Sequence, residues 1–303
     1  VGLVLITALY AIFGGMMSVL YTSVLQTPIL LLGSLIILVL GLRELGGWDE
    51  MMRICSAVKV NEYGDSMTNL IRSNSDPQYP WLGALVGSAV IGFWYWCTDQ
   101  FIVQRVLSGK NEREARRGTI FGAYLKLLPV FLFLIPGMIA FALHQNMGDF
   151  LPMMPNGSPN SDAAFPTLVA KLLPAGVKGL IVCGILAALM SSLASLFNSS
   201  AALFTIDFYQ RFKPKTDPKK LVKIGQAATV VIVVLGILWI PVMRSVGDVL
   251  YLYLQDVQSV LAPGIAAAFL IGILWKRATA MGGMWALLSG LIIGLTRLGA
   301  KIY

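Results

Sequence analysis

The chain has 303 residues, of which 57% are hydrophobic and only 13% are charged, and its mean hydropathy is +0.76. Soluble domains carry about 25% charged residues, so this composition excludes an ordinary soluble protein and indicates an all-α protein that crosses a membrane several times. The net charge of +8 is spread over loops between apolar segments, which argues against a nucleic-acid-binding face. With one histidine and no cysteine–histidine cluster, the chain offers no ligand set for a zinc or haem centre.

Apolar runs divide the chain into one partial and seven full predicted spans. The partial span covers residues 1–13 and ends at Gly14-Gly15. A helix needs roughly 20 apolar residues to cross the hydrocarbon core, and runs of about this length or longer lie near 16–42, 81–106, 117–143, 176–206, 225–243, 247–273 and 279–299. Because the chain begins at Val1 without a methionine or a leader, we expect a piece of a longer protein, in which residues 1–303 form one transmembrane domain.

The loops between these spans differ in their basic residues. Loops 107–117, 207–224 and 274–279 are rich in lysine and arginine, whereas loops 46–80 and 144–175 mix both signs or are nearly uncharged. Basic loops of membrane proteins face the cytoplasm. The sequence therefore predicts a multi-pass protein of the cell membrane, with the three basic loops in the cytoplasm and loops 46–80 and 144–175 outside.

A polar cluster interrupts the predicted span at 81–106. Tyr95, Thr98 and Asp99 recur at helical spacing, which predicts a phenol, a hydroxyl and a carboxylate on one helix face. Trp96 and Gln100 fall on a neighbouring face. Aromatic rings and amides together suit a ligand with many hydroxyls on an apolar ring. The alternative is an aromatic belt at the membrane interface, which accounts for Trp96 but not for Asp99 and Gln100.

Among the charged residues inside predicted spans, Asp99 and Lys126 form the sharpest pair. A charge at the centre of a membrane helix costs at least about 2.5 kcal/mol, so such residues usually face a bundle interior or a hydrated path. The alternative is that the two neutralise each other, or that each side chain reaches back to the interface.

The predicted span at 176–206 carries a stripe of small polar residues. Ser191, Ser195, Asn198 and Ser199 recur at i, i+4, i+7 and i+8, so they share one helix face. One interpretation is packing, because small residues let membrane helices approach closely and serine can bond to its own helix backbone. The other is a site for a hard cation, which prefers hydroxyl and carbonyl oxygens.

Several stretches together resemble the sodium:solute symporter family, specifically its sodium/glucose cotransporter branch of the bacterial type. In chain order they are "GGMMSVLYTSVLQT", "WYWCTDQFIVQRVLSGKN", "GAYLKLLPVFLFLIPGM", "ALMSSLASLFNSSAALFTIDFY", "LQDVQSVLAPGIAAAFL" and "LWKRATAMGGMWALLSGLIIGL". The resemblance implies a fragment of the LeuT-like fold of five plus five inverted-repeat helices. It implies that the chain runs from the end of the fourth core helix through the eleventh.

The resemblance also implies binding residues. For sodium, it implies the carbonyl of Ala188 and the hydroxyls of Ser191 and Ser192, with further ligands from helices that precede this chain. For a sugar, it implies the following set: Lys126, Gln255, the aromatic gate Tyr95, and Trp96 and Gln100 beside it.

Two positions depart from members that hold a second sodium ion. Those members have an aspartate where this chain has Ser23, and a hydroxyl residue where it has Ala194, although Ser195 remains. We therefore expect a degenerate second site and one sodium per sugar.

The function implied by the resemblance is sodium-coupled symport of a glucose-like sugar or inositol by alternating access, with sodium as the coupling ion, no other cofactor and no enzymatic chemistry. The expected partners are sodium, a sugar or polyol and the lipid bilayer, and no nucleic acid. A sugar sensor that does not transport, a passive channel, or a symporter of another small solute remain alternatives.

Overall fold

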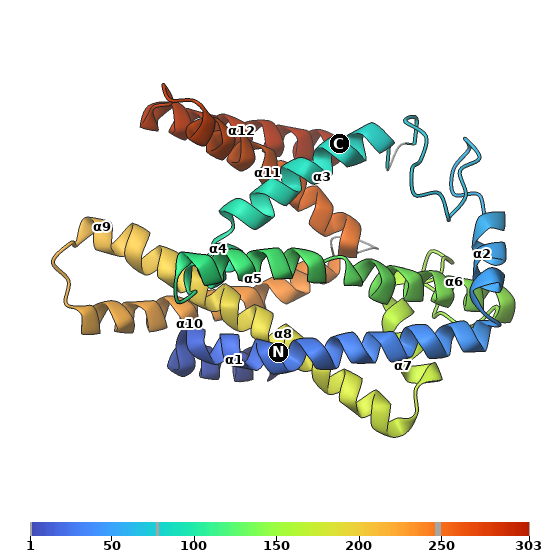
Figure 1. Ribbon diagram of the computed structural model, residues 1–303. Helices are drawn as coiled ribbons and strands as arrows, with labels where there is room; N and C mark the ends of the chain where they lie inside the picture. Colours follow the sequence, from blue (N-terminus) through green and yellow to red (C-terminus); the bar gives the residue numbers. More distant parts are fainter. Residues whose placement is uncertain (1, 77–78, 246–249, 303) are drawn as a thin grey trace. The chain divides into compact units, whose positions relative to one another are not determined.

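The computed structural model describes residues 2–76, 79–245 and 250–302 (Figure 1). The regular secondary structure of the described residues is helical apart from two isolated antiparallel bridges, Lys59 with Ser66 and Met153 with Pro159, so the predicted all-α class is confirmed. The elements are α1 (Gly2–Leu45), α2 (Trp48–Ala57), α3 (Trp81–Phe93), η1 (Trp94–Thr98), α4 (Gln100–Leu107), α5 (Glu112–Leu125), η2 (Val130–Leu134), α6 (Ile135–Met147), η3 (Ser161–Ala163), α7 (Ala164–Leu172), α8 (Ala175–Ala202), η4 (Leu203–Tyr209), α9 (Gln210–Phe212), α10 (Pro218–Ser245), α11 (Leu250–Leu274) and α12 (Ala280–Ile302).

Seven segments of the described chain are long and apolar enough to cross a membrane. They are Gln26–Leu45, Trp81–Thr98, Glu112–Met147, Ala175–Phe212, Pro218–Pro241, Val257–Leu274 and Ala280–Arg297. These match the seven full spans predicted from the sequence, because the hydrocarbon thickness sets the same length requirement for each.

The predicted break at Gly14-Gly15 is wrong, because α1 runs through it as one helix of 44 residues. Each glycine costs about 1 kcal/mol in a helix interior, which tertiary packing offsets. Ala8 and Ala11, just before the glycines, are buried in an apolar cluster with Phe197 of α8 and Val233 of α10. These contacts hold the first turns of α1 in line with the rest of the helix.

Helices also extend into segments predicted to be loops. Helix α5 begins at Glu112, five residues before the predicted span, and its N-terminus is capped by Asn111, whose Oδ1 accepts a hydrogen bond of 2.9 Å from the Glu114 amide. Helix α10 begins at Pro218 within the predicted loop 207–224. Charged residues therefore continue helices beyond the apolar runs, because capping and charge pairs sustain exposed turns.

The chain divides into two compact units. The first unit comprises Val1–Met51 and Lys110–Val246, and its main helix pair is α1 with α8, flanked by α6, α7 and α10. The second comprises Met52–Gly109 and Gly247–Tyr303, in which α11 packs along α12 and contacts α3 and η1 (Figure 1). The single transmembrane domain predicted for residues 1–303, and the sides assigned to its loops, stay predictions.

Two glycines allow α11 and α12 to touch through their backbones. A Cβ atom added to Gly290 would lie 2.6 Å from the Cα of Gly264, and one added to Gly294 would clash with the carbonyl of Val260. Small residues at such crossings let membrane helices gain van der Waals contact. This crossing organises the second unit.

Candidate functional site

The polar stripe of α8 lies buried within the first unit. Ser191, Ser195 and Ser199 are 5%, 0% and 3% exposed, and Asn198 beside them is half-buried. Since α8 packs against α1 and α10, this stripe faces neighbouring helices. Three hydroxyls are thus removed from lipid over two to three turns of one helix.

Ser23 of α1 meets this stripe directly. Its Oγ lies 2.5 Å from the Oγ of Ser191, within hydrogen-bond distance, and either atom can be the donor. The contact joins the residue predicted for the degenerate second sodium site to a residue predicted for the first. Sequence spacing alone could not pair them, because 168 positions separate them.

Glycine contacts fix the register of α1 against α8. A Cβ on Gly33 would meet Ile181, and a Cβ on Gly184 would meet Ile29, so the two helices run antiparallel at close range on either side of these contacts. Gln26 lies one turn beyond Ser23 on α1, and its Oε1 atom is buried with no hydrogen-bond partner among the described residues. No sequence pattern predicted a role for Gln26, although it stands in the same stretch as Ser23, "YTSVLQT".

The remaining residues predicted for sodium lie elsewhere on α8. Ala188 is half-buried and Ser192 is exposed. Ala194 is fully buried in the apolar cluster that includes Ala11 and Phe197. The second-site position Ala194 is therefore surrounded by hydrocarbon side chains, while Ser23 and Ser195 stand beside or within the polar stripe.

The predicted continuous helix at 81–106 is wrong, because the helix breaks at Asp99. Helix α3 passes into the π-helical turn η1, and Asp99 then adopts an extended conformation with ψ of 118° before α4 begins. The Asp99 Oδ1 atom accepts a hydrogen bond of 3.0 Å from the Phe101 amide. A carboxylate at this position caps the helix and interacts favourably with its positive end. The carboxylate predicted as an intramembrane charge thus caps a helix that starts within the predicted span.

The break also changes how the aromatic residues are arranged. Tyr95 packs edge-on against Trp96, with ring centroids 5.3 Å apart, and Trp94 lies 6.4 Å from Tyr95. Tyr95 and Gln100 are half-buried, whereas Trp96 is 47% exposed. π-helical turns often occur at functional sites, and broken helices line the binding sites of inverted-repeat transporters.

Gln255 belongs to the same unit as this aromatic group. It lies on α11, which packs against η1, and it is half-buried. Lys126 belongs to the other unit, where it is exposed and ends α5, with its amide bonded to the Gly122 carbonyl at 3.0 Å. Four of the five residues predicted to bind sugar therefore lie in one compact unit.

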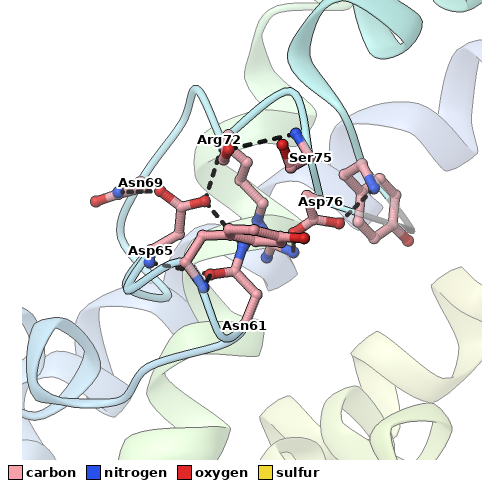
Figure 2. A network of polar contacts seen from close by, with 9 residues as sticks. Asn61, Asp65, Asn69, Arg72, Ser75 and Asp76 are labelled. Atoms are coloured by element: carbon pink, nitrogen blue, oxygen red, sulfur yellow. Dashed lines mark hydrogen bonds and ion pairs between the residues drawn. The ribbon is translucent and has the colours of Figure 1, made fainter.

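A polar network orders residues 58–76, which lie in the predicted loop 46–80 (Figure 2). Asn61 donates to Asp65 at 2.8 Å and to Asp76 at 2.9 Å, and Arg72 pairs with Asp76 at 3.5 Å. Hydrogen bonds from the Asn61 side chain and from the Ser73 amide lower the pKa of Asp65. The density of Asn, Asp and Ser in "NEYGDSMTNLIRSNSD" was the available signal, since these side chains bond to nearby backbone groups.

Comparison with known proteins relates the chain to one family over nearly its whole length. The description of the Sodium:solute symporter family matches residues 1–290. The chain is 39% identical to sodium/myo-inositol cotransporter 2 of Homo sapiens, over 98% of this chain and 46% of the relative. It is 39% identical to a sodium/mannose cotransporter of Bos taurus, over 97% and 52%, and 38% identical to sodium/glucose cotransporter 4 of Mus musculus, over 98% and 46%.

A solved structure has the same fold. It is a Na+-coupled sialic acid symporter in a substrate-bound outward-open state, which superposes with a TM-score of 0.72 at 23% identity, over 96% of this chain and 65% of that one. The predicted LeuT-like fold is thereby confirmed. The chain spans about half the length of the curated relatives it matches. This is a multi-pass membrane protein, and it belongs to the sodium:solute symporter family.

Proposed function

We propose that the whole protein moves a sugar or polyol across the cell membrane together with sodium, by alternating access. The observation that carries this proposal is the family match over residues 1–290, because the relatives are named for sodium with myo-inositol, mannose or glucose. These three solutes share a six-membered ring that bears several hydroxyls. The fold needs no covalent chemistry for this function, since a shared preference of ion and solute for one conformation is sufficient coupling.

In this proposal the ion binds beside the buried stripe of α8. Ser191, Ser192 and the Ala188 carbonyl supply three oxygens of the kind that hard cations prefer. Hard cations take about six such ligands in proteins, so these three oxygens do not complete the coordination by themselves. Inward movement of the ion also uses the membrane potential, which contributes about 2.3 kcal/mol per charge for each 100 mV.

The solute binds in this proposal beside the break at Asp99. Tyr95 and Trp96 offer flat apolar rings, and Gln100 and Gln255 offer hydrogen bonds to hydroxyl groups. Lys126 belongs to the other unit, and its contact with the solute stays a prediction from the family resemblance. The half-buried positions of Tyr95, Gln100 and Gln255 support this assignment, because such side chains can contact a ligand and remain fixed by protein.

We further infer one sodium per solute. Two oxygens that share a cation at about 2.4 Å lie roughly 3.4 Å apart when they subtend a right angle, whereas Ser23 and Ser191 lie 2.5 Å apart. An ion therefore does not fit between them as they stand, and Ala194 adds no oxygen. The same proposal includes cytoplasmic loops at 107–117, 207–224 and 274–279, no enzymatic activity and no cofactor besides sodium.

The test is counterflow uptake of radiolabelled myo-inositol, mannose and glucose into liposomes that contain the whole protein. Uptake of at least one solute should rise when sodium replaces choline outside. Binding without uptake would identify a sensor, and uptake that ignores sodium would identify a channel. Either result would contradict sodium-coupled symport.

A further inference from the structure

Ser191 differs from three other hydroxyl residues of the first unit in its hydrogen-bond partner. Thr7, Ser199 and Thr229 each donate to a carbonyl three or four residues earlier in their own helix, at 2.7–3.0 Å. Such bonds to the same helix are the usual arrangement in membrane spans. The Ser191 hydroxyl instead pairs across the interface with Ser23 of α1.

An ion beside Ser191 would decide the direction of this hydrogen bond. A serine oxygen has one hydrogen and two lone pairs, and a cation attracts the lone pairs and repels the hydrogen. With sodium bound, the Ser191 hydrogen must therefore point away from the ion. Ser23 Oγ lies 2.5 Å away and is an acceptor in a suitable place.

We propose that Ser23 is a positioning residue of the sodium site, which accepts the Ser191 hydrogen and so leaves the lone pairs of Ser191 Oγ for the ion. This inference rests on the proposed function, in which Ser191 binds sodium. Ser23 then does more than mark a lost second site, because it acts on the first site through Ser191. The antiparallel contacts at Gly33 and Gly184 hold the two helices close enough for this bond.

The test is equilibrium binding of radioactive sodium to the purified whole protein, with thermal unfolding measured in parallel. Ser23→Ala should raise the sodium dissociation constant about three- to tenfold, the size expected for one lost hydrogen bond. Ser23→Thr keeps a hydroxyl and should bind sodium within about twofold of the wild type. Thr27→Ala is the matched control, because Thr27 is exposed and its hydroxyl donates only to the Ser23 carbonyl at 2.9 Å among the bonds the structure records.

A double-mutant cycle separates positioning from packing. In the Ser191→Ala background, Ser23→Ala should not weaken sodium binding further, because the hydroxyl that it orients is gone. Additive losses, or an unchanged dissociation constant in Ser23→Ala, would overturn the positioning role while the proposed function stands. If Ser191→Ala itself binds sodium normally, the proposed sodium site at Ser191 is wrong. This result differs from the ones that overturn only the positioning role of Ser23.

Discussion

Asp99 is a charged residue within a membrane span, and a local contact, the cap of α4, accounts for its position. Its carboxylate meets the free Phe101 amide at the start of α4, which a backbone break at this point leaves without a helical partner. The helix break therefore accounts for the presence of a carboxylate within the span, because the carboxylate caps the helix that starts there. Gln100, one of the proposed solute contacts, follows Asp99 as the first residue of α4.

Replacing Asp99 separates capping from charge. Asp99→Ala should lower the free energy of unfolding by about 1 kcal/mol, the usual cost of a lost N-cap, whereas Asp99→Asn should cost little because asparagine caps equally well. Thermal unfolding in detergent measures both, with Asn111→Ala at the cap of α5 as a control of similar size. A well-folded Asp99→Asn variant that no longer transports would show that the charge has a role beyond capping.

Gln255 provides the second test at this scale. Gln255→Ala should raise the KM for the transported solute about two- to tenfold, since a neutral hydrogen bond contributes about 0.5–1.5 kcal/mol. The half-saturating sodium concentration should not change. Gln226→Ala on α10, whose amide donates to the Ile12 carbonyl at 3.5 Å, is the control and should keep the KM. An unaltered KM in Gln255→Ala would remove this residue from the solute site.

At the scale of elements, close contacts between helices in this chain occur at glycines, which have no side chain to keep the helices apart. Gly264 and Gly290 bring α11 and α12 into backbone contact. Gly33 of α1 and Gly184 of α8 each make room for an isoleucine side chain of the other helix. Between membrane helices such contact replaces the hydrophobic effect, which lipid does not supply.

Gly290→Ala should destabilise the α11–α12 pair by about 1–3 kcal/mol, because the new Cβ would lie 2.6 Å from the Gly264 Cα and backbone cannot rotate aside. Gly283, on the same helix, has open space around it. Gly283→Ala should therefore raise the stability of the protein slightly, since alanine favours the helix. Thermal unfolding of the two purified variants checks this. Equal stability of both would mean that α11 and α12 can separate without cost.

The polar network of residues 58–76 should respond to acid in a defined direction. Hydrogen bonds from Asn61 and Ser73 favour the Asp65 carboxylate and place its pKa below its ordinary value of 3.8. Its contribution is therefore fully present above pH 3.8 and is lost as pH falls through the lower folded value. Hydrogen exchange at the Ser73 amide should stay slow from pH 8 to 5 and become fast in Asp65→Ala. Opening of the loop already near pH 6 would contradict this account.

At the scale of the whole molecule, coupling depends on how many ions bind before the conformational change. The short contact of Ser23 with Ser191 and the apolar surroundings of Ala194 both argue for one ion. Because a symporter's gradient is limited by its stoichiometry, one sodium per solute gives a smaller accumulation than two at the same membrane potential.

Sodium-dependent uptake by the whole protein should follow a Hill coefficient near one, since a single coupled ion gives no sigmoidal response. Reversal-potential measurements on liposomes should give one sodium per solute. The control is a solute-free leak measured in the same vesicles. A coefficient clearly above one, or a reversal potential that requires two ions, would show that Ser23 and Ala194 do not report the loss of a second site.

The sequence by itself determined the class of the protein, its seven full spans and its family. Apolar run length predicts spans because the membrane thickness imposes one length on all of them, and six motif-bearing stretches distributed along the chain predicted the symporter fold. Helical spacing also identified the polar stripe of α8, since positions 191, 195, 198 and 199 share a face wherever the helix packs.

The tertiary structure decided which of these residues meet and where helices stop. The contact of Ser23 with Ser191 joins residues 168 positions apart, so it depends on the register between two helices, which no local pattern contains. The sequence predicted a continuous helix through Asp99, where the helix breaks. It predicted a break at Gly14-Gly15, where α1 is continuous. In both cases contacts formed by distant elements or by a cap outweighed about 1 kcal/mol of local preference, which is why periodicity located the helices but packing set their ends.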